Sequence, residues 1–307
     1  MSALSKILNS FRNQAISERD KGTDFEQLVR VYLRHEPFYK DIYENVWMYA
    51  DWAELQGYLR KDTGIDLVAK TTTGEFHAIQ CKNYAPEYKI AKADIDSFFT
   101  ASGRRDFSHR VIVTTTNEWT NNALSALDNQ NPPVSVINLA DLERSQIDWE
   151  AYVVDEPVYS VADEPIRLKQ QKTLREHQRS ALESVTNGFK TKERGKLIMA
   201  CGTGKTFTSL RMAEELCGPG KKVLFLVPSL ALLSQTLTEW TQESHTLLHN
   251  FAVCSDSEVG KKRNQDDDRI QTTLSDLQYP ATTNSERLAQ QVALRHDATH
   301  MTVIYAT

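Results

Sequence analysis

Residues 64–82 read GIDLVAKTTTGEFHAIQCK, and this stretch decides the fold of the first half of the chain. Its two ends, residues 64–70 and 76–82, are short runs in which apolar residues dominate, and the segment TTTGE between them has the composition of a turn. Two such runs separated by a short turn are typical of a β-hairpin. The stretch therefore predicts two paired strands.

Three polar side chains of this hairpin are expected to meet at one spot. Side chains alternate between the two faces of a strand, so Gln80 and Lys82 share a face. A turn near Thr73 and Gly74 brings Asp66 opposite Gln80, to within one position. A carboxylate that holds a divalent cation, a second oxygen ligand and a lysine beside the attacking water are the groups that cleave a phosphodiester. The hairpin therefore indicates a metal-dependent nuclease site, in which the neutral Gln80 contributes less charge than a carboxylate.

A helix is predicted before the hairpin. Residues 23–33 carry apolar side chains at helical spacing after Gly22, as in an amphipathic helix. Glu26 lies beside the apolar stripe, from which it can reach the metal from the other side, and an ordinary solvated glutamate is an equal alternative. Taken singly, the hairpin residues have structural alternatives too: a strand-edge aspartate, an exposed lysine and a glutamine at a sheet edge. Their combined spacing favours the nuclease.

Strand and helix patterns alternate in the rest of the first half. Residues 92–102 and 121–128 have helical patterns, and residues 110–115 and 134–139 have strand patterns. Such alternation favours a layered α/β domain. The acidic, proline-containing segment 155–165, DEPVYSVADEP, shows no periodicity and is expected to be a linker.

A second motif lies beyond the linker. The apolar strand pattern of residues 196–199 runs into ACGTGKT at residues 200–206, and a helical pattern follows. This is the context of a phosphate-binding loop, in which glycines let backbone N–H groups turn toward phosphate oxygens and the helix N-terminus adds positive potential. Lys205 would reach the terminal phosphates of a nucleotide, and Thr206 would hold its magnesium ion. Met199 stands where the longer motif has its first glycine.

Two further strand patterns, at residues 222–227 and 302–306, indicate a parallel sheet around this loop. Residues 255–300 between them are polar, and we expect a surface insertion that contains a helix near residues 285–295. The second half is therefore also predicted to be α/β.

Composition limits the classes of protein. The 307 residues are 40% hydrophobic and 25% charged, as in a globular protein of two domains. The formal net charge of −5 argues against a basic surface for non-specific nucleic-acid binding, so any DNA contact must be local. Basic clusters at Arg104, Arg105 and Arg110 and at residues 167–179 are candidates, although most charge runs are only solvated surface.

The sequence also bears on the cellular compartment. No run of about 18 apolar residues is present, and the first residues lack the pattern of a cleaved signal peptide. We therefore expect a cytoplasmic protein without membrane contact. The four cysteines lie far apart in the sequence, so we expect reduced thiols and no zinc knuckle.

The first motif resembles that of a known nuclease family. Glu26 on an early helix, Gly-Ile-Asp66 and Ile-Gln80-Cys-Lys82 are similar to the D-x(n)-QxK variant of the PD-(D/E)xK nucleases, as found in Mrr-like restriction enzymes. The resemblance covers residues 20–140. It implies an Mrr-like restriction-endonuclease fold and hydrolysis of DNA with Mg²⁺. The metal ligands that it implies are Glu26, Asp66, Gln80 and the backbone carbonyl of Cys81.

The second half resembles the motor of superfamily 2 helicases. Leu174-Arg-Glu-His-Gln178 is similar to their adenine-contacting Arg-x-x-Gln motif, Val227-Pro-Ser229 to motif Ia, and Ile304-Tyr-Ala-Thr307 to the start of motif Ib. The resemblance implies a RecA-like domain that binds ATP with Mg²⁺. It also implies that Ser229 and Thr307 face a DNA strand, although a plain strand-end hydroxyl is an equal alternative for each. The residues implied at the nucleotide are Arg175, Gln178, Gly202, Thr203, Gly204, Lys205 and Thr206.

We therefore expect an α/β chain with an Mrr-like nuclease domain at residues 1–154, a linker at residues 155–170 and part of a RecA-like parallel-sheet domain at residues 171–307. This order resembles the motor subunits of Type I and the single-chain Type ISP restriction enzymes, which continue into a second RecA-like domain, a methyltransferase and a target-recognition domain. The resemblance implies an N-terminal fragment of a DNA endonuclease coupled to an ATP-driven translocase on double-stranded DNA. ATP turnover is then expected only in the longer protein.

Two alternatives stay open. The first is a DNA-binding or docking module of a repair helicase, which keeps the nuclease fold but does not cut. The second is a nuclease-helicase of defence or repair that has no methyltransferase.

Overall fold

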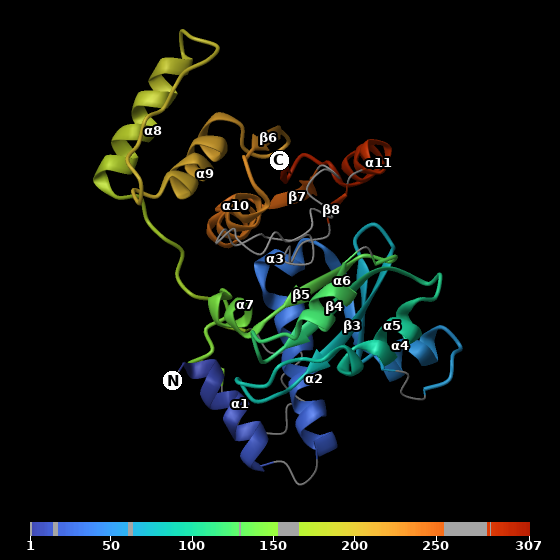
Figure 1. The fold of residues 1–307 in the computed structure, drawn as a ribbon. Helices are drawn as coiled ribbons and strands as arrows, with labels where there is room; N and C mark the ends of the chain where they lie inside the picture. Colours follow the sequence, from blue (N-terminus) through green and yellow to red (C-terminus); the bar gives the residue numbers. More distant parts are fainter. Residues whose placement is uncertain are drawn as a thin grey trace. The chain divides into compact units, whose positions relative to one another are not determined.

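Figure 1 shows the fold as a computed structural model, which describes residues 2–14, 18–60, 64–128, 130–152, 166–254, 281–282 and 284–307. The described residues form two compact units, which divide between Lys169 and Gln170. The predicted linker at residues 155–165 and the larger part of the predicted polar insertion, residues 255–280, lie outside the described residues. No helix of the described part is both long and apolar enough to cross a membrane.

The first unit is built on a five-stranded sheet whose strands follow chain order. Strands β1 to β3 run antiparallel, and β3 to β5 run parallel. The strands are β1 (Tyr43–Met48), β2 (Leu67–Thr71), β3 (Phe76–Lys82), β4 (Phe107–Thr114) and β5 (Val134–Ile137). The predicted hairpin is present as β2 and β3, and its pairing of Leu67 with Ile79 sets Asp66 opposite Gln80.

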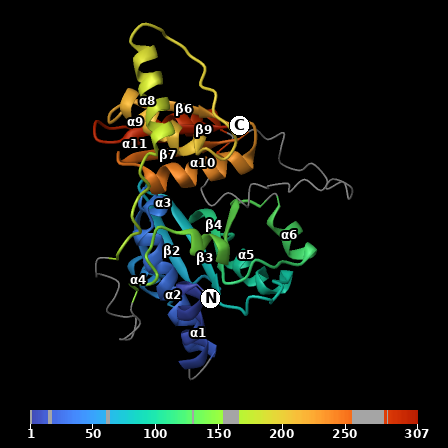
Figure 2. The same ribbon diagram turned by 90° about the vertical axis from the view of Figure 1, so that its left-hand side faces the viewer.

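Helices cover both faces of this sheet. Figure 2 shows α2 on one side of β3 and β4, and α5 and α6 on the other. On the side of α5 and α6, Phe98 and Ala123 pack with Trp52 of α4 against Val68 and Ile112 of the sheet. The helices are α1 (Ala3–Gln14), α2 (Glu18–His35), α3 (Pro37–Lys40), α4 (Tyr49–Leu55), α5 (Asp96–Ser102), α6 (Asn121–Leu127) and α7 (Leu139–Arg144), with a 3-10 turn η1 (Lys92–Asp94). The layered α/β architecture expected for this half is confirmed.

Local signals explain where several of these elements begin. The Thr120 hydroxyl accepts a hydrogen bond from the Ala123 N–H at 3.3 Å and caps α6. The Asn138 amide oxygen accepts from the Asp141 N–H at 3.2 Å and caps α7, so β5 ends before Leu139, where the sequence predicts strand. β4 is buried along nearly its whole length, as expected for a strand covered by helices on both faces.

The second unit is built on four parallel strands in the order β6-β9-β7-β8. The strands are β6 (Lys222–Leu226), β7 (Leu248–Val253), β8 (Ala281–Thr282) and β9 (Met301–Ala306). Four helices accompany them: α8 (Glu176–Phe189), α9 (Lys205–Leu216), α10 (Leu230–Glu243) and α11 (Ser285–Arg295). The parallel sheet and the helix within the polar segment are thus confirmed. β9 lies between β6 and β7 although it follows both in the chain.

Trp240 of α10 joins the parts of the second unit. Its side chain is fully buried, and its ring lies 4.9 Å from that of Phe225 in β6 and 5.8 Å from that of Tyr305 in β9. Its Nε1–H donates to the Thr206 carbonyl of α9 at 3.0 Å. One side chain therefore connects the helix after the phosphate loop to the sheet.

The predicted strand at residues 196–199 is not formed. Leu197 and Ile198 are 43% and 81% exposed, and no described strand pairs with this segment. A strand needs a neighbour to satisfy its backbone groups, and this segment has none among the described strands. The apolar run that indicated a strand is therefore irregular in this structure.

Arg110 is not available for the phosphate contact suggested by its basic cluster. It is 3% exposed, and its guanidinium donates to Ser102 Oγ at 2.8 Å and to the Pro132 carbonyl at 3.0 Å. Burial also lowers the pKa of the Arg110 side chain. Arg110 therefore belongs to the core that links β4 to its neighbouring loops.

Candidate functional site

Asp66 is fixed against β3 at the position that the hairpin pattern predicts. Its backbone N–H donates to the Ile79 carbonyl at 3.0 Å, and its Oδ2 accepts from the Cys81 N–H at 2.6 Å. The carboxylate thus lies where β2 begins and β3 ends. The backbone N–H of Cys81 therefore helps to fix the orientation of the carboxylate.

Gln80 lies inside the sheet, not at its edge, and is 2% exposed. Its Nε2 donates to the Gly64 carbonyl at 3.2 Å, while its Oε1 is buried without a hydrogen-bond partner among the described residues. Gly64 has a φ of +89°, and a Cβ there would lie 3.2 Å from Ser97 Oγ. Glycine is therefore required where the backbone passes close to Ser97. The turn before β2 therefore holds the Gln80 amide in place.

The charged residues predicted at this site lie within electrostatic reach of Cys81. Burial raises the pKa of the Cys81 thiol, the charges of Asp66 and Glu26 raise it further, and Lys82 lowers it. Glu26 comes from α2, which packs against β3. The fold thus brings Glu26 from a separate element to the end of β3 that carries Cys81 and Lys82.

The second candidate site is the loop at residues 200–206. Gly202 and Gly204 have φ values of +74° and +79°, a conformation that side chains disfavour. Lys205 Nζ donates to the carbonyls of Met199 at 3.0 Å and Ala200 at 3.2 Å, so its ammonium lies over the loop. These are the features of a phosphate-binding loop at the start of α9.

The beginning of α8 is tied to this loop through Thr203. Gln178 Nε2 donates to the Thr203 carbonyl at 3.0 Å, and Gln178 Oε1 accepts from the Arg175 N–H at 2.9 Å. His177 Nε2 also contacts the Thr203 carbonyl, at 3.1 Å. Sequence reasoning missed His177, and only its position next to Gln178 could have indicated it.

Ser229 and Thr307 follow two neighbouring parallel strands at their carboxyl ends. β6 pairs with β9 up to Leu226 and Ala306, so the residues beyond lie at the same edge of the sheet. The Ser229 hydroxyl accepts from the Leu232 N–H at 3.3 Å and caps α10. Ser229 therefore has a structural role in addition to the predicted one.

Comparison with known proteins divides the chain in the same way. Residues 34–158 match the family described as restriction endonuclease, and residues 171–303 match the family described as the res subunit of Type III restriction enzymes. Each half therefore contains a domain similar to one of these two families. The first domain is therefore an endonuclease of the restriction class and the second a helicase-type domain.

Two solved structures are similar to this chain. The chain is 34% identical to the structure described as the ATP-dependent Type ISP restriction-modification enzyme LlaBIII bound to DNA, with a TM-score of 0.77 over 98% of this chain and 18% of that chain. A nuclease-deletion mutant of the Type ISP enzyme LlaGI with a DNA substrate mimic is 40% identical over 44% of this chain and 13% of that chain, with a TM-score of 0.35. No curated protein matches.

The matched ranges contain most of the candidate residues. Asp66, Gln80 and Lys82 lie within the restriction-endonuclease range, whereas Glu26 precedes it. The loop at residues 200–206 lies within the res-subunit range. The chain spans less than a fifth of the length of LlaBIII. The expected Type ISP-like arrangement of an Mrr-like nuclease before a helicase-type domain is confirmed.

Proposed function

We propose that the nuclease domain hydrolyses phosphodiesters of double-stranded DNA with Mg²⁺, and that the helicase domain binds ATP that drives movement along the duplex in a longer restriction enzyme. The observation that carries the nuclease assignment is the unpaired, buried Oε1 of Gln80 opposite Asp66. Leaving a buried acceptor unsatisfied costs about 1–3 kcal/mol. Such an atom is explained by a ligand that it contacts in the working enzyme.

The donor set fits a hard divalent cation. Mg²⁺ prefers oxygen ligands, and Asp66, Gln80 and Glu26 supply two carboxylates and an amide oxygen. By the family resemblance, the carbonyl of Cys81 is a further ligand. When bound, the cation polarises the scissile phosphate and neutralises part of its charge.

The chain's own residues have separate tasks at this site. The contact with the Cys81 N–H holds the Asp66 carboxylate in one orientation, and the contact with Gly64 holds the amide of Gln80. Lys82 places a positive charge beside the scissile phosphate, where it positions the attacking water and offsets the charge that develops at phosphorus. Glu26 completes the negative charge of the metal site from α2.

The nucleotide is proposed to bind at residues 200–206 with Mg²⁺ at Thr206. When the nucleotide binds, Lys205 leaves the carbonyls of Met199 and Ala200 and contacts the terminal phosphates. The ammonium forms stronger hydrogen bonds with charged phosphate oxygens than with neutral carbonyl oxygens. Gln178 and Arg175 lie at the adenine end. The Gln178 amide contacts the Thr203 carbonyl in the loop and the Arg175 N–H. A contact between Gln178 and adenine would therefore connect the base to the conformation of the loop at residues 200–206.

DNA cleavage in Mg²⁺ tests the nuclease assignment. Lys82→Ala or Asp66→Ala should abolish cutting while folding and nucleotide binding persist, because these groups act on the phosphate and not on the core. Lys70→Ala is the matched control, since Lys70 lies on the neighbouring strand and pairs with Glu44 at 2.8 Å. Cleavage by Lys82→Ala at the parent rate would overturn the assignment.

Metal titration separates a nuclease from a docking module that does not cut. The parent protein should bind Mg²⁺ or Mn²⁺, Asp66→Ala should lose this binding, and Gln80→Glu should bind more tightly because it adds a charge. A protein that binds no divalent cation through Asp66 would support the docking module. Lys205→Ala, compared with the exposed Lys221→Ala, tests the nucleotide site in the same preparations.

A further inference from the structure

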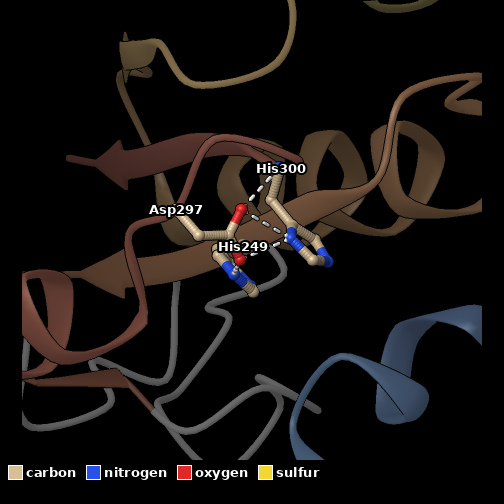
Figure 3. A group of neighbouring side chains, drawn as sticks. All are labelled: His249, Asp297 and His300. Carbon is tan, nitrogen blue, oxygen red and sulfur yellow. Dashed lines mark hydrogen bonds and ion pairs between the residues drawn. The ribbon is translucent and has the colours of Figure 1, made fainter.

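A group of three side chains in the helicase domain has no part in either site. His249 lies in β7, and Asp297 and His300 lie between α11 and β9, so the group joins segments 48 residues apart in the chain. Figure 3 shows the two imidazoles next to each other, with the Asp297 carboxylate beside both. One ligand atom from each residue lies within 4.8 Å of the others.

The carboxylate of Asp297 is held rigidly by the loop that carries it. Oδ1 accepts from the N–H groups of Thr299 at 2.7 Å and His300 at 2.8 Å, and from the Thr299 hydroxyl at 2.9 Å. Oδ2 lies 3.1 Å from His249 Nε2 and 2.8 Å from His300 Nδ1. His300 Nδ1 also lies 2.9 Å from Oδ1, so the loop anchors Oδ1, and Oδ2 is the oxygen that contacts both histidines.

The spacing of these atoms is close to that of a zinc site. A tetrahedral Zn²⁺ ion with bonds of about 2.0–2.2 Å keeps its ligand atoms about 3.3 Å apart. The two contacts of Oδ2 are shorter than this by a few tenths of an ångström. The imidazole rings are stacked, 3.8 Å apart and 15° from parallel, so they must spread apart for both to direct a nitrogen at one ion. A small opening of the group would admit the ion.

We infer that His249, Asp297 and His300 form a binding site for a transition-metal ion of the Zn²⁺ class. Two imidazoles and a carboxylate suit Zn²⁺ better than Mg²⁺, which prefers oxygen alone. Three protein ligands leave a fourth position for water. The ion would fasten the loop before β9 to the beginning of β7.

Arg295 sets the strength of this site. Its Nη2 lies 3.1 Å from His249 Nδ1, and because arginine only donates, Nδ1 accepts and the ring proton is on Nε2. Zn²⁺ at Nε2 moves this proton to Nδ1, where it faces a donor, so the Arg295 contact must open. Arg295 therefore competes with the metal, and Arg295→Gln, whose amide oxygen can accept from Nδ1–H, should tighten binding by about tenfold.

The experiment measures Zn²⁺ binding by calorimetry, and Co²⁺ binding by its visible absorption, in the whole chain carrying Asp66→Ala. This background removes the proposed nuclease metal site, so the result does not depend on that assignment. One equivalent of Zn²⁺ should bind and raise the Tm. His300→Gln, which keeps a hydrogen-bonding group near Asp297, should lose the Co²⁺ spectrum, whereas His177→Ala in the same domain should retain it.

The folding of each variant is checked by circular dichroism without metal. If His300→Gln is unstable, the proposal is tested by two other variants. His249→Gln should lose metal binding, and Arg295→Gln should bind Zn²⁺ more tightly. Absence of binding in the parent overturns the proposal. Binding that survives both His249→Gln and His300→Gln, or that weakens in Arg295→Gln, overturns it as well.

Discussion

Gly204 is the residue at which the phosphate loop leaves least room. A Cβ at this position would collide with the amide of Gln178, and the φ of +79° is itself unfavourable for a side chain. Gly204→Ala should therefore weaken ATP binding by roughly tenfold, since the left-handed conformation alone costs about 1–2 kcal/mol. Fluorescent-nucleotide titration measures the change.

Gly188→Ala is the matched control, because Gly188 lies in α8 and a Cβ there meets nothing within 4 Å. It should leave nucleotide affinity unchanged. If Gly204→Ala binds ATP as tightly as Gly188→Ala, the left-handed conformation at Gly204 does not determine the affinity of the loop for ATP.

At the residue scale, strand alternation was enough to predict the pairing of Asp66 with Gln80. It could not predict that Gln80 Oε1 is buried without a partner among the described residues, because this depends on how the turn at Gly64 passes over the strand. For Arg110 the sequence suggested the wrong environment. Its charge suggested an exposed cluster, but the side chain is buried and donates hydrogen bonds to Ser102 and the Pro132 carbonyl.

Glu214 links two elements of the helicase domain. Its side chain on α9 accepts from Arg211 Nη1 at 2.5 Å, and from Ser244 Oγ at 2.8 Å and the His245 N–H at 2.6 Å between α10 and β7. Glu214→Gln should lower the free energy of unfolding of this domain by about 1.5–3 kcal/mol, the range for hydrogen bonds to a charged group. Denaturant unfolding measures it, with the exposed neighbour Glu215→Gln expected to have little effect.

The same contact should depend on pH. Burial alone would raise the pKa of Glu214, but the hydrogen bonds from Arg211, Thr246 and Ser244 lower it below its ordinary value of 4.5. A carboxylate with a lowered pKa in the folded state stabilises the protein above pH 4.5 and loses this effect as the pH falls through the folded value. The difference between parent and Glu214→Gln should therefore shrink in acid. A difference that stays constant from pH 7 to pH 3 would exclude this role.

At the scale of elements, helices and strands with clear periodicity were predicted, and those with mixed composition were not. β7 was missed because Asn250 interrupts its apolar run. The structure buries Asn250 completely, and its amide donates to Thr241 Oγ1 at 3.2 Å and accepts from the Tyr305 hydroxyl at 3.1 Å. These partners come from α10 and β9, so local sequence could not reveal them. At residues 196–199 the local pattern was clear, but the segment has no neighbouring strand in the described part.

Proteolysis tests the organisation of the whole molecule. Residues 155–165 are acidic, contain prolines and lack periodicity, and linkers of this kind are cut before compact domains. Brief digestion with proteinase K should cut there first and release a stable nuclease domain, identified by mass spectrometry. First cleavage between residues 64 and 128 would contradict the two-domain organisation.

The two sheets differ in the order in which a ribosome can complete them. In the first, each strand pairs with the one made just before it, so the sheet can grow as the chain emerges. In the second, β9 lies between β6 and β7, and 47 residues separate the end of β7 from the beginning of β9. At about 5–20 residues per second, roughly 2–10 s pass between the synthesis of β7 and that of β9, and longer between β6 and β9. During synthesis, the helicase domain therefore exposes unpaired strand edges longer than the nuclease domain does, and it is the half that most needs a chaperone.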